Sequence, residues 1–424
     1  MKQGRSRPSG TPQPTLTRRS LLIGAGGAAL LGASRSTAAA KRGSHVAVIG
    51  AGVFGTWTAV HLLRSGHRVT LIDAWGPAHS RASSGGESRM TRAAYGKDSI
   101  YARMALDSLK EWKALSLHSG LPIFHQSGVL FFFPTNDAYA RDSLAVHKQM
   151  GLSTQALGAT EMARRFPMID FGGVEVGLYE PDFGVLMARR AVQTLAGTFI
   201  QSGGTYVTGA ALPVQASGDS LKSIRLRSGQ QLEADAFIFA AGPWLPKLFP
   251  DVVGRRIQPT RQEIFFFAPP AGEDRFGPKA LPGWADFNGG DLYYGMPDIE
   301  GRGVKFARDT HGVEVDPDTQ SRRPTDEALA NVIAFRDRRF PLLRGAPLTE
   351  ARVCQYENSS NGDLLIDFHP RLANVLLVGA GSGHGFKHGP EVGRYAARRL
   401  VREGEVEHRF SLASKSEVHR REVI

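Results

Sequence analysis

Three glycines near residue 50 have the spacing of a phosphate-binding turn. They stand in Gly50-x-Gly52-x-x-Gly55, directly after an apolar stretch at 45–49. In such a turn the first glycine permits the tight bend and the second lets the backbone approach a pyrophosphate. The third lets a helix pack closely against the strand. The spacing therefore predicts that a dinucleotide binds here.

The residues after this turn complete a βαβ unit. A helix-like stretch follows at 56–63, and its N-terminus offers free N–H groups and a partial positive charge to the phosphates. Val53 and Phe54, just before it, are expected to contact the cofactor. A second apolar strand at 68–73 ends in Asp73, which follows Gly55 by 18 residues. A carboxylate there can accept hydrogen bonds from a ribose hydroxyl. The whole unit is far more specific than a glycine triplet alone.

Composition indicates a globular enzyme-sized chain and gives no sign of nucleic-acid binding. The 424 residues are 42 % hydrophobic and 22 % charged. The formal net charge is +12, but residues 1–40 hold six basic residues and no acid, which leaves +6 (12 − 6) for the rest. No basic run with interleaved aromatic residues stands out there, so the surplus charge is expected on solvated surface. A single cysteine excludes an intrachain disulfide.

Residues 1–40 have the pattern of a twin-arginine export signal. Arg18-Arg19 precedes a short Gly/Ala-rich apolar segment, and small residues at 36–40 form an A-x-A cleavage site. The alternative is a disordered basic tail. The apolar part is too short to stay in a bilayer, and no other segment approaches 18 uninterrupted apolar residues. We expect export of the folded protein by the twin-arginine machinery, a periplasmic, cell-envelope or extracellular location, and no permanent membrane span.

The hydrophobic pattern predicts an α/β fold with two domains. Strands near residues 46, 236 and 375 each run into glycines, as in a Rossmann-like parallel sheet assembled from distant segments. The expected nucleotide-binding domain comprises 44–125, 182–258 and 351–412. The second, α+β substrate domain is expected to be built on an antiparallel sheet. It comprises 126–181 and 259–350.

Three further segments are predicted from local pattern. The aromatic runs at 128–133 and 262–267 are ended by prolines and read as strands of the sheet core, not as a ligand-stacking surface. Residues 99–118 are expected to be helical. The Gly/Ser/Arg-rich stretch 80–97 is expected to be a polar loop.

Several segments spread over the chain form a family signature. They are 50–52, 86–96, 293–295, 316–319, 353–356 and 382–387. Together and in this order they resemble the monomeric sarcosine oxidase branch of the D-amino-acid-oxidase superfamily, a group of enzymes that oxidise secondary amines of amino acids. The resemblance implies a two-domain monomer with FAD rather than NAD. It also implies an amino acid as the small-molecule substrate, O2 as electron acceptor and hydrogen peroxide as product.

The single cysteine matches the site where this family attaches its flavin. Cys354 stands in Arg352-Val353-Cys354-Gln355-Tyr356, and the implied bond joins its sulfur to the 8α carbon of the flavin. Such a bond needs a thiolate, which Arg352 or the flavin itself could favour. Outside this context a lone cysteine is most often a small buried hydrophobic residue.

The resemblance also assigns the residues around the substrate. Arg92 and Lys387 match two cations that hold its carboxylate, and Lys387 is also expected near the cofactor. The alternative is a pair of ordinary surface salt bridges. Arg89 is expected beside the flavin face. Tyr294 and Tyr356 match pocket-lining positions, although either could be plain core.

A lysine and a glycine loop complete the implied flavin site. Lys305 matches the lysine that the family uses, through water, to activate oxygen. Gly383, His384 and Gly385 are expected to wrap the pyrimidine end of the flavin, where backbone donors stabilise negative charge. His384 could instead be a structural histidine. No His/Cys/Asp spacing predicts a metal site.

Asp309 departs from the sarcosine oxidase pattern, which has a histidine there, and matches the acid of the fructosyl amino acid oxidase branch. On a strand at 304–309 it shares a face with Lys305. It could pair with a cation such as that lysine and stay structural, or face the ligand and select a second ammonium or hydroxyl groups. The substrate therefore stays open between sarcosine-like or N-methyl amino acids and fructosyl, cyclic or dibasic ones. A flavin dehydrogenase that passes electrons to an envelope acceptor, and a non-catalytic nucleotide-binding module, are the remaining alternatives.

Overall fold

The predicted phosphate-binding turn joins the first strand and first helix of a six-stranded sheet. The computed structural model describes residues 40–287, 292–310 and 312–417. The strand order is β18-β19-β12-β1-β2-β9, and neighbours are parallel except β18 and β19. The strands are β1 (His45–Ile49), β2 (Arg68–Asp73), β9 (Thr205–Thr208), β12 (Ala236–Phe239), β18 (Leu365–Phe368) and β19 (Val375–Gly379). The sheet is thus assembled from distant segments, as expected for a Rossmann-like domain.

Helices pack on this sheet through small residues. Helix α8 approaches α1 so closely that a Cβ at Gly393 would lie 2.6 Å from a backbone carbon of Trp57. Helix α5 turns an apolar stripe from Ala188 to Phe199 inward. The helices of this region are α1 (Val53–Arg64), α2 (Ser99–Ser119), α5 (Ala188–Gln201), α6 (Leu245–Leu248) and α8 (Gly389–Leu400).

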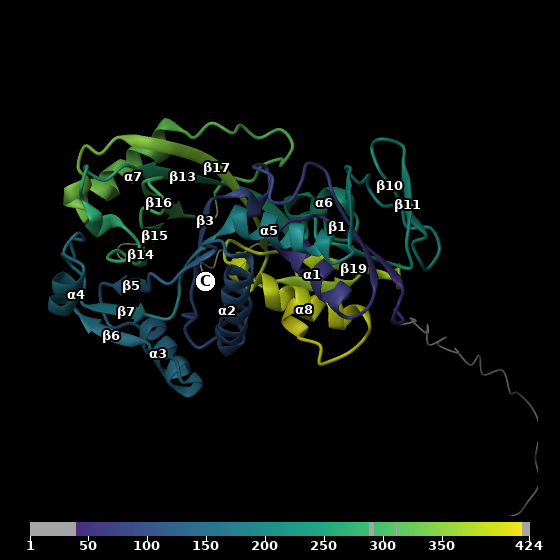
Figure 1. The fold of residues 1–424 in the computed structure, drawn as a ribbon, viewed down its shortest axis with the longest axis horizontal. Coiled ribbons are helices and arrows are strands. Elements are labelled where there is room, and N and C mark those ends of the chain that lie inside the picture. Colours follow the sequence, from purple (N-terminus) through teal and green to yellow (C-terminus); the bar gives the residue numbers. More distant parts are fainter. Residues whose placement is uncertain (1–39, 288–291, 311, 418–424) are drawn as a thin grey trace, which may run out of the picture. The chain divides into compact units, whose positions relative to one another are not determined.

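The second large sheet has eight strands, in the order β17-β13-β16-β15-β14-β5-β7-β6. All neighbours are antiparallel except β5 and β14. Figure 1 shows its strands on the opposite side of the view from β1 and β19. The strands are β5 (Val129–Phe133), β6 (Gln155–Gly158), β7 (Val176–Glu180), β13 (Ile257–Phe267), β14 (Gly283–Asp286), β15 (Leu292–Met296), β16 (Val304–Asp309) and β17 (Leu348–Ser359).

One face of the eight-stranded sheet is an aromatic core. Alternate residues of its strands, among them Phe132, Phe265 and Phe306, pack with Phe335 of α7 (Asp326–Arg339). The other helices of this part are α3 (Ala138–Met150) and α4 (Ala159–Arg165). The two aromatic runs are therefore strands, as predicted, and most of their rings are core. The opposite face of this sheet lines a cavity.

The stretch 80–97 is not the simple loop that was predicted. It contains β3 (Ser88–Thr91), which pairs with β8 (Gly184–Met187), and β8 also pairs with β4 (Phe124–His125). The polar sequence hid this strand because its hydrogen-bond partner lies about a hundred residues further along the chain. A separate hairpin joins β10 (Ser223–Arg225) and β11 (Gln231–Glu233). The short 3-10 turns used below are η1 (Ser83–Gly85), η6 (Gly385–His388) and η7 (His408–Phe410).

The two sheets lie within one compact unit of residues 38–424. Strand β17 runs across the domain boundary that was expected at residue 351. Strand β13 begins just before the domain boundary that was expected at residue 259. Both strands belong to the eight-stranded sheet. The boundaries given above stay predictions. The predicted leader lies outside the described residues. Within the described ranges, no helix combines the length and the apolar character needed to cross a bilayer.

Candidate active site

The free face of the eight-stranded sheet forms the wall of a small cavity. Residues paired across neighbouring strands point to the same face. The register places the following row on that face: Phe131, Ala285, Tyr294, Ala307, Ile264 and Arg352. Cys354 and Tyr356 follow Arg352 along β17 on the same face. The cavity above this wall has a volume of about 100 Å³.

A larger cleft of about 300 Å³ opens between the glycine turn and the carboxyl ends of β1, β2 and β12. Its far end is lined by the indoles of Trp75 and Trp244, whose rings are 4.9 Å apart. The cleft and the small cavity share six wall residues: Arg89, Cys354, Tyr356, Ser382, Gly383 and Phe386. A dinucleotide in the cleft therefore extends directly to the small cavity.

The glycine turn fits a pyrophosphate. A Cβ at Gly55 would lie 1.8 Å from the Gly50 carbonyl oxygen, and one at Gly50 would lie 2.2 Å from that of Ala240. These two glycines are needed by the fold. At Gly52 the nearest atom is only the Ser84 hydroxyl, at 3.3 Å. Since Gly52 lines the cleft, a Cβ there would chiefly meet the ligand.

Asp73 organises the same turn. One carboxylate oxygen accepts from Ala51 N at 2.8 Å, and the other accepts from Trp75 N and Gly76 N at 2.9 Å each. The carboxylate also lines the cleft, so it can still receive a ribose hydroxyl. At the start of α1, Val53 N donates to the Ser84 hydroxyl at 3.0 Å, and Phe54 lines the cleft. The residues present fit a flavin dinucleotide.

Cys354 lies where the two cavities meet. Its sulfur is 3.5 Å from Nη2 of Arg89, which also donates to the Ser83 carbonyl at 2.7 Å. The cation beside the sulfur is therefore Arg89. Arg352, the residue suggested by the sequence, is instead ion-paired with Glu87 and Glu350. That difference follows from η1 and β3, which bring Ser83 and Arg89 to the sulfur.

Arg92 and Lys387 lie together in the small cavity. Arg92 directly follows β3 and Lys387 belongs to η6, and both side chains are buried. Lys387 Nζ donates to the His384 carbonyl at 2.9 Å, and Arg92 donates to the Ala94 carbonyl. Burial, and then the charge of Arg92, hold the pKa of Lys387 well below its usual value. Neither residue is a surface salt bridge, and a carboxylate between them would relieve their repulsion.

Lys305 lies on the same face of β16 as Ala307 and is fully buried. Its Nζ donates to the Ser88 carbonyl at 3.0 Å and lies 5.5 Å from the Tyr294 ring centroid. It is not among the described residues that line the two cavities. Burial, followed by the charge of Arg89, lowers its pKa strongly. The predicted oxygen-activating lysine thus lies close to Arg89 on the cavity face of the sheet, outside the lining of the two cavities.

Asp309 lines the small cavity beside two tyrosines. Its carboxylate accepts from Tyr356 OH at 3.2 Å. Burial raises the pKa of Tyr294 to about 12, and the charge of Asp309 adds to the effect. Lys305 donates to the Ser88 carbonyl instead of the Asp309 carboxylate. Asp309 lines the cavity, as the alternative in which it faces the ligand requires.

The glycine loop supports the site differently from the prediction. The N–H groups of His384 and Gly385 donate to the Gly381 carbonyl, at 2.9 and 2.7 Å, and so are already paired. A Cβ at Gly383 would come within 2.7 Å of the Tyr356 ring, and one at Gly385 within 2.7 Å of Phe54. These glycines allow close packing beside the cavities. Both ring nitrogens of His384 are hydrogen-bonded within the protein, which is the structural alternative for this residue.

Four buried polar residues near the cavities were not singled out from the sequence: Tyr95, Glu180, Glu357 and His388. Tyr95 lies inside the family segment 86–96, so that segment could have indicated it. Glu180 accepts from Ala93 N at 2.7 Å beside Arg92. Glu357 directly follows Tyr356 in the cleft wall, and nothing in its local sequence marks it. Among the described residues, no group of three His, Cys, Asp or Glu side chains could hold a metal ion.

Comparisons with known proteins show what the chain is similar to. The sequence pattern of the family described as DAO, FAD dependent oxidoreductase, matches residues 45–399. Monomeric sarcosine oxidase from Bacillus sp. (strain B-0618) is 31 % identical over 87 % of this chain and 95 % of its own length. N-methyl-L-tryptophan oxidase from Salmonella heidelberg (strain SL476) is 29 % identical over 82 % and 92 %.

Solved structures share the fold at lower identity. A fructosyl peptide oxidase thermally stable mutant matches with a TM-score of 0.75 at 20 % identity, over 87 % of this chain and 93 % of its own. Amadoriase I from Aspergillus fumigatus matches with a TM-score of 0.72 at 22 % identity, over 89 % and 90 %. The expected α/β fold, with a mixed parallel sheet and a large antiparallel sheet, is confirmed.

Proposed function

Because the chain belongs to the FAD-dependent oxidoreductase family, we propose that it oxidises a secondary-amine amino acid of the sarcosine or N-methyl type. When bound, FAD accepts hydrogen from the carbon beside the amine nitrogen and passes the electrons to O2, which becomes H2O2. The imine so formed hydrolyses in water. The homologues at about 30 % identity are oxidases of this kind, and they support an amine oxidase but do not specify the amine.

The observation that carries the proposal is the pair of buried cations in the small cavity. Arg92 offers a planar guanidinium and Lys387 a point charge on one side of the small cavity. The other wall contains Cys354, where the small cavity meets the nucleotide cleft. A carboxylate bound there orients the rest of an amino acid toward that boundary. The neighbouring apolar wall, with Phe131 and Ile264, excludes water from the reacting carbon.

Arg92 and Lys387 together form a clamp for the substrate carboxylate, and we assign supporting roles to the residues beside it. Lys305 lies next to Arg89, where negative charge develops as oxygen is reduced, and that negative charge would favour its ammonium form. The deep position of Lys305 is compatible with action through a water molecule. Arg89 borders both cavities and helps to hold the flavin against the substrate. Tyr294 and Tyr356 close the pocket and position Asp309.

We also propose that the flavin is attached covalently through Cys354. Two observations support this. The sulfur lies in the wall that both cavities share, and Nη2 of Arg89 lies 3.5 Å from the sulfur. An exported enzyme also benefits from a cofactor that it cannot lose. Export by the twin-arginine route remains a proposal drawn from residues 1–40 alone.

Asp309 supports a second candidate substrate class. Its carboxylate faces the cavity close enough to affect Lys387 electrostatically. A carboxylate beside the reacting amine would favour the ammonium form and hinder oxidation. Asp309 therefore suits a donor group on the substrate side chain, such as a second ammonium or the hydroxyls of a fructosyl group.

An anaerobic screen tests the proposal. The purified holoenzyme is mixed under argon with N-methyl, cyclic, fructosyl and dibasic amino acids, and the flavin absorbance is followed. We expect bleaching by at least one secondary amino acid, and peroxide on admission of air. Bleaching without peroxide would instead support a dehydrogenase. No bleaching by any amine would support a non-catalytic nucleotide-binding module.

A further inference from the structure

The two cations of the clamp share one aromatic ring. The Arg92 guanidinium carbon lies 4.2 Å from the ring centroid of Tyr95, and Lys387 Nζ lies 4.9 Å from it. Tyr95 is itself buried. A ring face carries negative potential and attracts cations, most strongly where water is excluded. The ring therefore offsets part of the repulsion between two buried positive charges.

The hydroxyl of Tyr95 is held between two histidines. It lies 3.0 Å from Nδ1 of His384 and 2.7 Å from Nε2 of His388. Burial lowers the pKa of both histidines well below the usual value, and the charge of Lys387 adds to this, so both are neutral. His384 Nε2 lies 3.1 Å from the Gly362 carbonyl, which can only accept.

These contacts fix one arrangement of protons. His384 must carry its proton on Nε2, so its Nδ1 accepts from the Tyr95 hydroxyl. The Tyr95 oxygen in turn accepts from His388 Nε2–H. The chain runs His388 to Tyr95 to His384 to Gly362, with every donor used once. Such a chain holds the tyrosine in one rotamer and adds no charge beneath the clamp.

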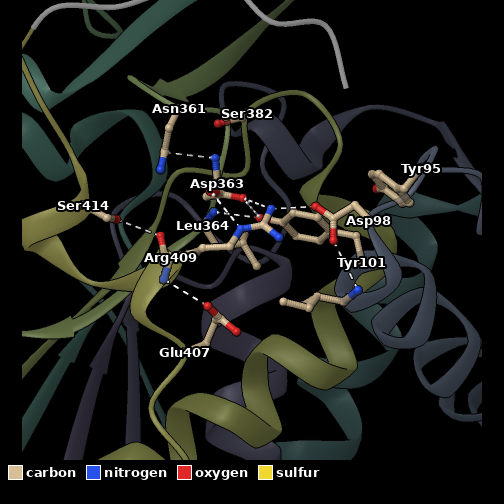
Figure 2. Close-up of polar contacts among 12 residues, drawn as sticks. Tyr95, Asp98, Tyr101, Asn361, Asp363, Leu364, Ser382, Glu407, Arg409 and Ser414 are labelled. Carbon is tan, nitrogen blue, oxygen red and sulfur yellow. Dashed lines mark hydrogen bonds and ion pairs between the residues drawn. The ribbon is translucent and has the colours of Figure 1, made fainter. Parts of the chain in front are cut away.

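A second layer holds the ring from behind. The ring of Tyr101 is stacked on Tyr95, with centroids 5.3 Å apart. Its hydroxyl donates to Asp363 at 3.0 Å, and Figure 2 shows Arg409 between Asp363 and Asp98, at 2.6 Å from each. Asp98 also caps α2 by accepting from Ile100 N. The ring is thus fixed by an ion-pair network that includes η7 near the end of the chain.

We propose that Tyr95 is a positioning residue of the substrate clamp. Its ring face holds Arg92 and Lys387 side by side, so that both reach one carboxylate, and its hydroxyl chain keeps the ring in place. The inference rests on the proposed function, since it takes the ligand of the clamp to be a carboxylate. It predicts that carboxylate affinity depends on the electron density of the ring and not only on its shape.

Fluorination of the ring tests this directly. Tyr95→Phe is compared with replacements by 4-fluoro-, 3,5-difluoro- and 3,4,5-trifluorophenylalanine, which keep the ring shape but progressively remove its negative potential. Acetate is titrated into each holoenzyme, and its Kd is read from the change in flavin absorbance. We expect the Kd to rise steadily with fluorine number, by about tenfold at three fluorines. If Tyr95→Phe does not fold, mono- and difluorotyrosine, which keep the hydroxyl, give the same comparison.

Controls separate the possible failures. The same replacements at Tyr206, on β9 of the other sheet, should leave the acetate Kd unchanged. A Kd that is flat across the series at Tyr95, or that rises equally at Tyr206, overturns the role of Tyr95 but leaves the clamp standing. A wild-type holoenzyme that responds to acetate and to acetamide alike, or to neither, overturns the carboxylate clamp and this inference together.

Discussion

Charge in the small cavity is concentrated on a few residues. Its described wall carries the cations Arg89, Arg92 and Lys387 and the acid Asp309. An amino acid zwitterion matches such a wall, because its carboxylate gains charge-assisted hydrogen bonds that are stronger than neutral ones. The position of Asp309 decides what else the cavity accepts.

Asp309→Asn should change the choice of substrate more than the rate of the reaction. The amide keeps the size of the side chain but removes the charge. We expect the KM of a dibasic amino acid to rise by about tenfold, as for one lost charged hydrogen bond. The KM of an N-methyl amino acid with an apolar side chain should change by less than about threefold. Equal effects on both substrates would show that Asp309 does not select the side chain.

Cys354→Ser should release the flavin on denaturation. The wild-type protein, precipitated with acid, is expected to give a yellow pellet, and Cys354→Ser a colourless pellet with a yellow supernatant. Ser83→Ala serves as a control, since only the Ser83 backbone carbonyl contacts the sulfur and Arg89. A colourless wild-type pellet contradicts covalent attachment.

Glu357 should make stability depend on pH. This buried carboxyl lines the cleft, one of its oxygens has no hydrogen-bond partner in the described structure, and burial raises its pKa from 4.5 to about 7. The folded state therefore prefers the protonated form. This contribution is fully present below pH 4.5 and is lost as the pH rises through 7.

Glu357→Gln tests this dependence, because the amide imitates the protonated acid. At pH 8 the variant should be more stable than the wild type by roughly 3 kcal/mol, and at pH 4.5 the two should differ little. Urea unfolding at both pH values measures the difference. A difference that does not change with pH would contradict the raised pKa.

At the scale of elements, the site depends on short segments with distant partners. β3 pairs with β8 and so places Arg89 and Arg92 over the eight-stranded sheet. η6 places Lys387 beside Arg92, and Trp112 Nε1 of α2 donates to the Lys387 carbonyl at 2.8 Å. These elements are too short to be stable alone. Their conformation is set by tertiary contacts.

The glycine turn allows a prediction for this scale. Gly52→Ala should change the free energy of unfolding by less than about 1 kcal/mol, because only a hydroxyl must move aside. It should nevertheless lower the flavin content of the purified protein. Gly55→Ala should prevent folding, because its Cβ would overlap the Gly50 carbonyl. The absorbance ratio at 450 and 280 nm and urea unfolding distinguish the two effects. Normal flavin content in Gly52→Ala would contradict the assigned role.

Sequence reasoning succeeded where the signal is local. The βαβ unit, the aromatic strands and the helix at 99–119 follow from periodicity and turn residues. It failed for β3, whose polar sequence has no strand pattern, and for the partner of Cys354, which depends on the fold of η1. It also missed Tyr95 and His388. The sequence does not distinguish a tyrosine or histidine that supports the site from one in the core, because the distinction depends on tertiary contacts.

At the scale of the molecule, two sheets meet at one boundary. The six-stranded sheet supplies most of the nucleotide cleft and the eight-stranded sheet supplies the cavity wall, and β17 contributes residues to both. The shared residues Arg89, Cys354 and Tyr356 make the two cavities continuous. The sequence predicted a nucleotide-binding domain and a separate substrate domain. That the two cavities are continuous could be seen only from the strand register of the structure.

The central claim is that a carboxylate held by Arg92 and Lys387 presents the amine to the flavin. The most direct test is the rate of flavin bleaching under argon by an N-methyl amino acid and by its carboxamide, in the wild type and in Arg92→Leu. We predict fast bleaching by the acid in the wild type, and bleaching at least about 100-fold slower for the carboxamide and for Arg92→Leu. Equal rates for acid and carboxamide in the wild type would contradict the account.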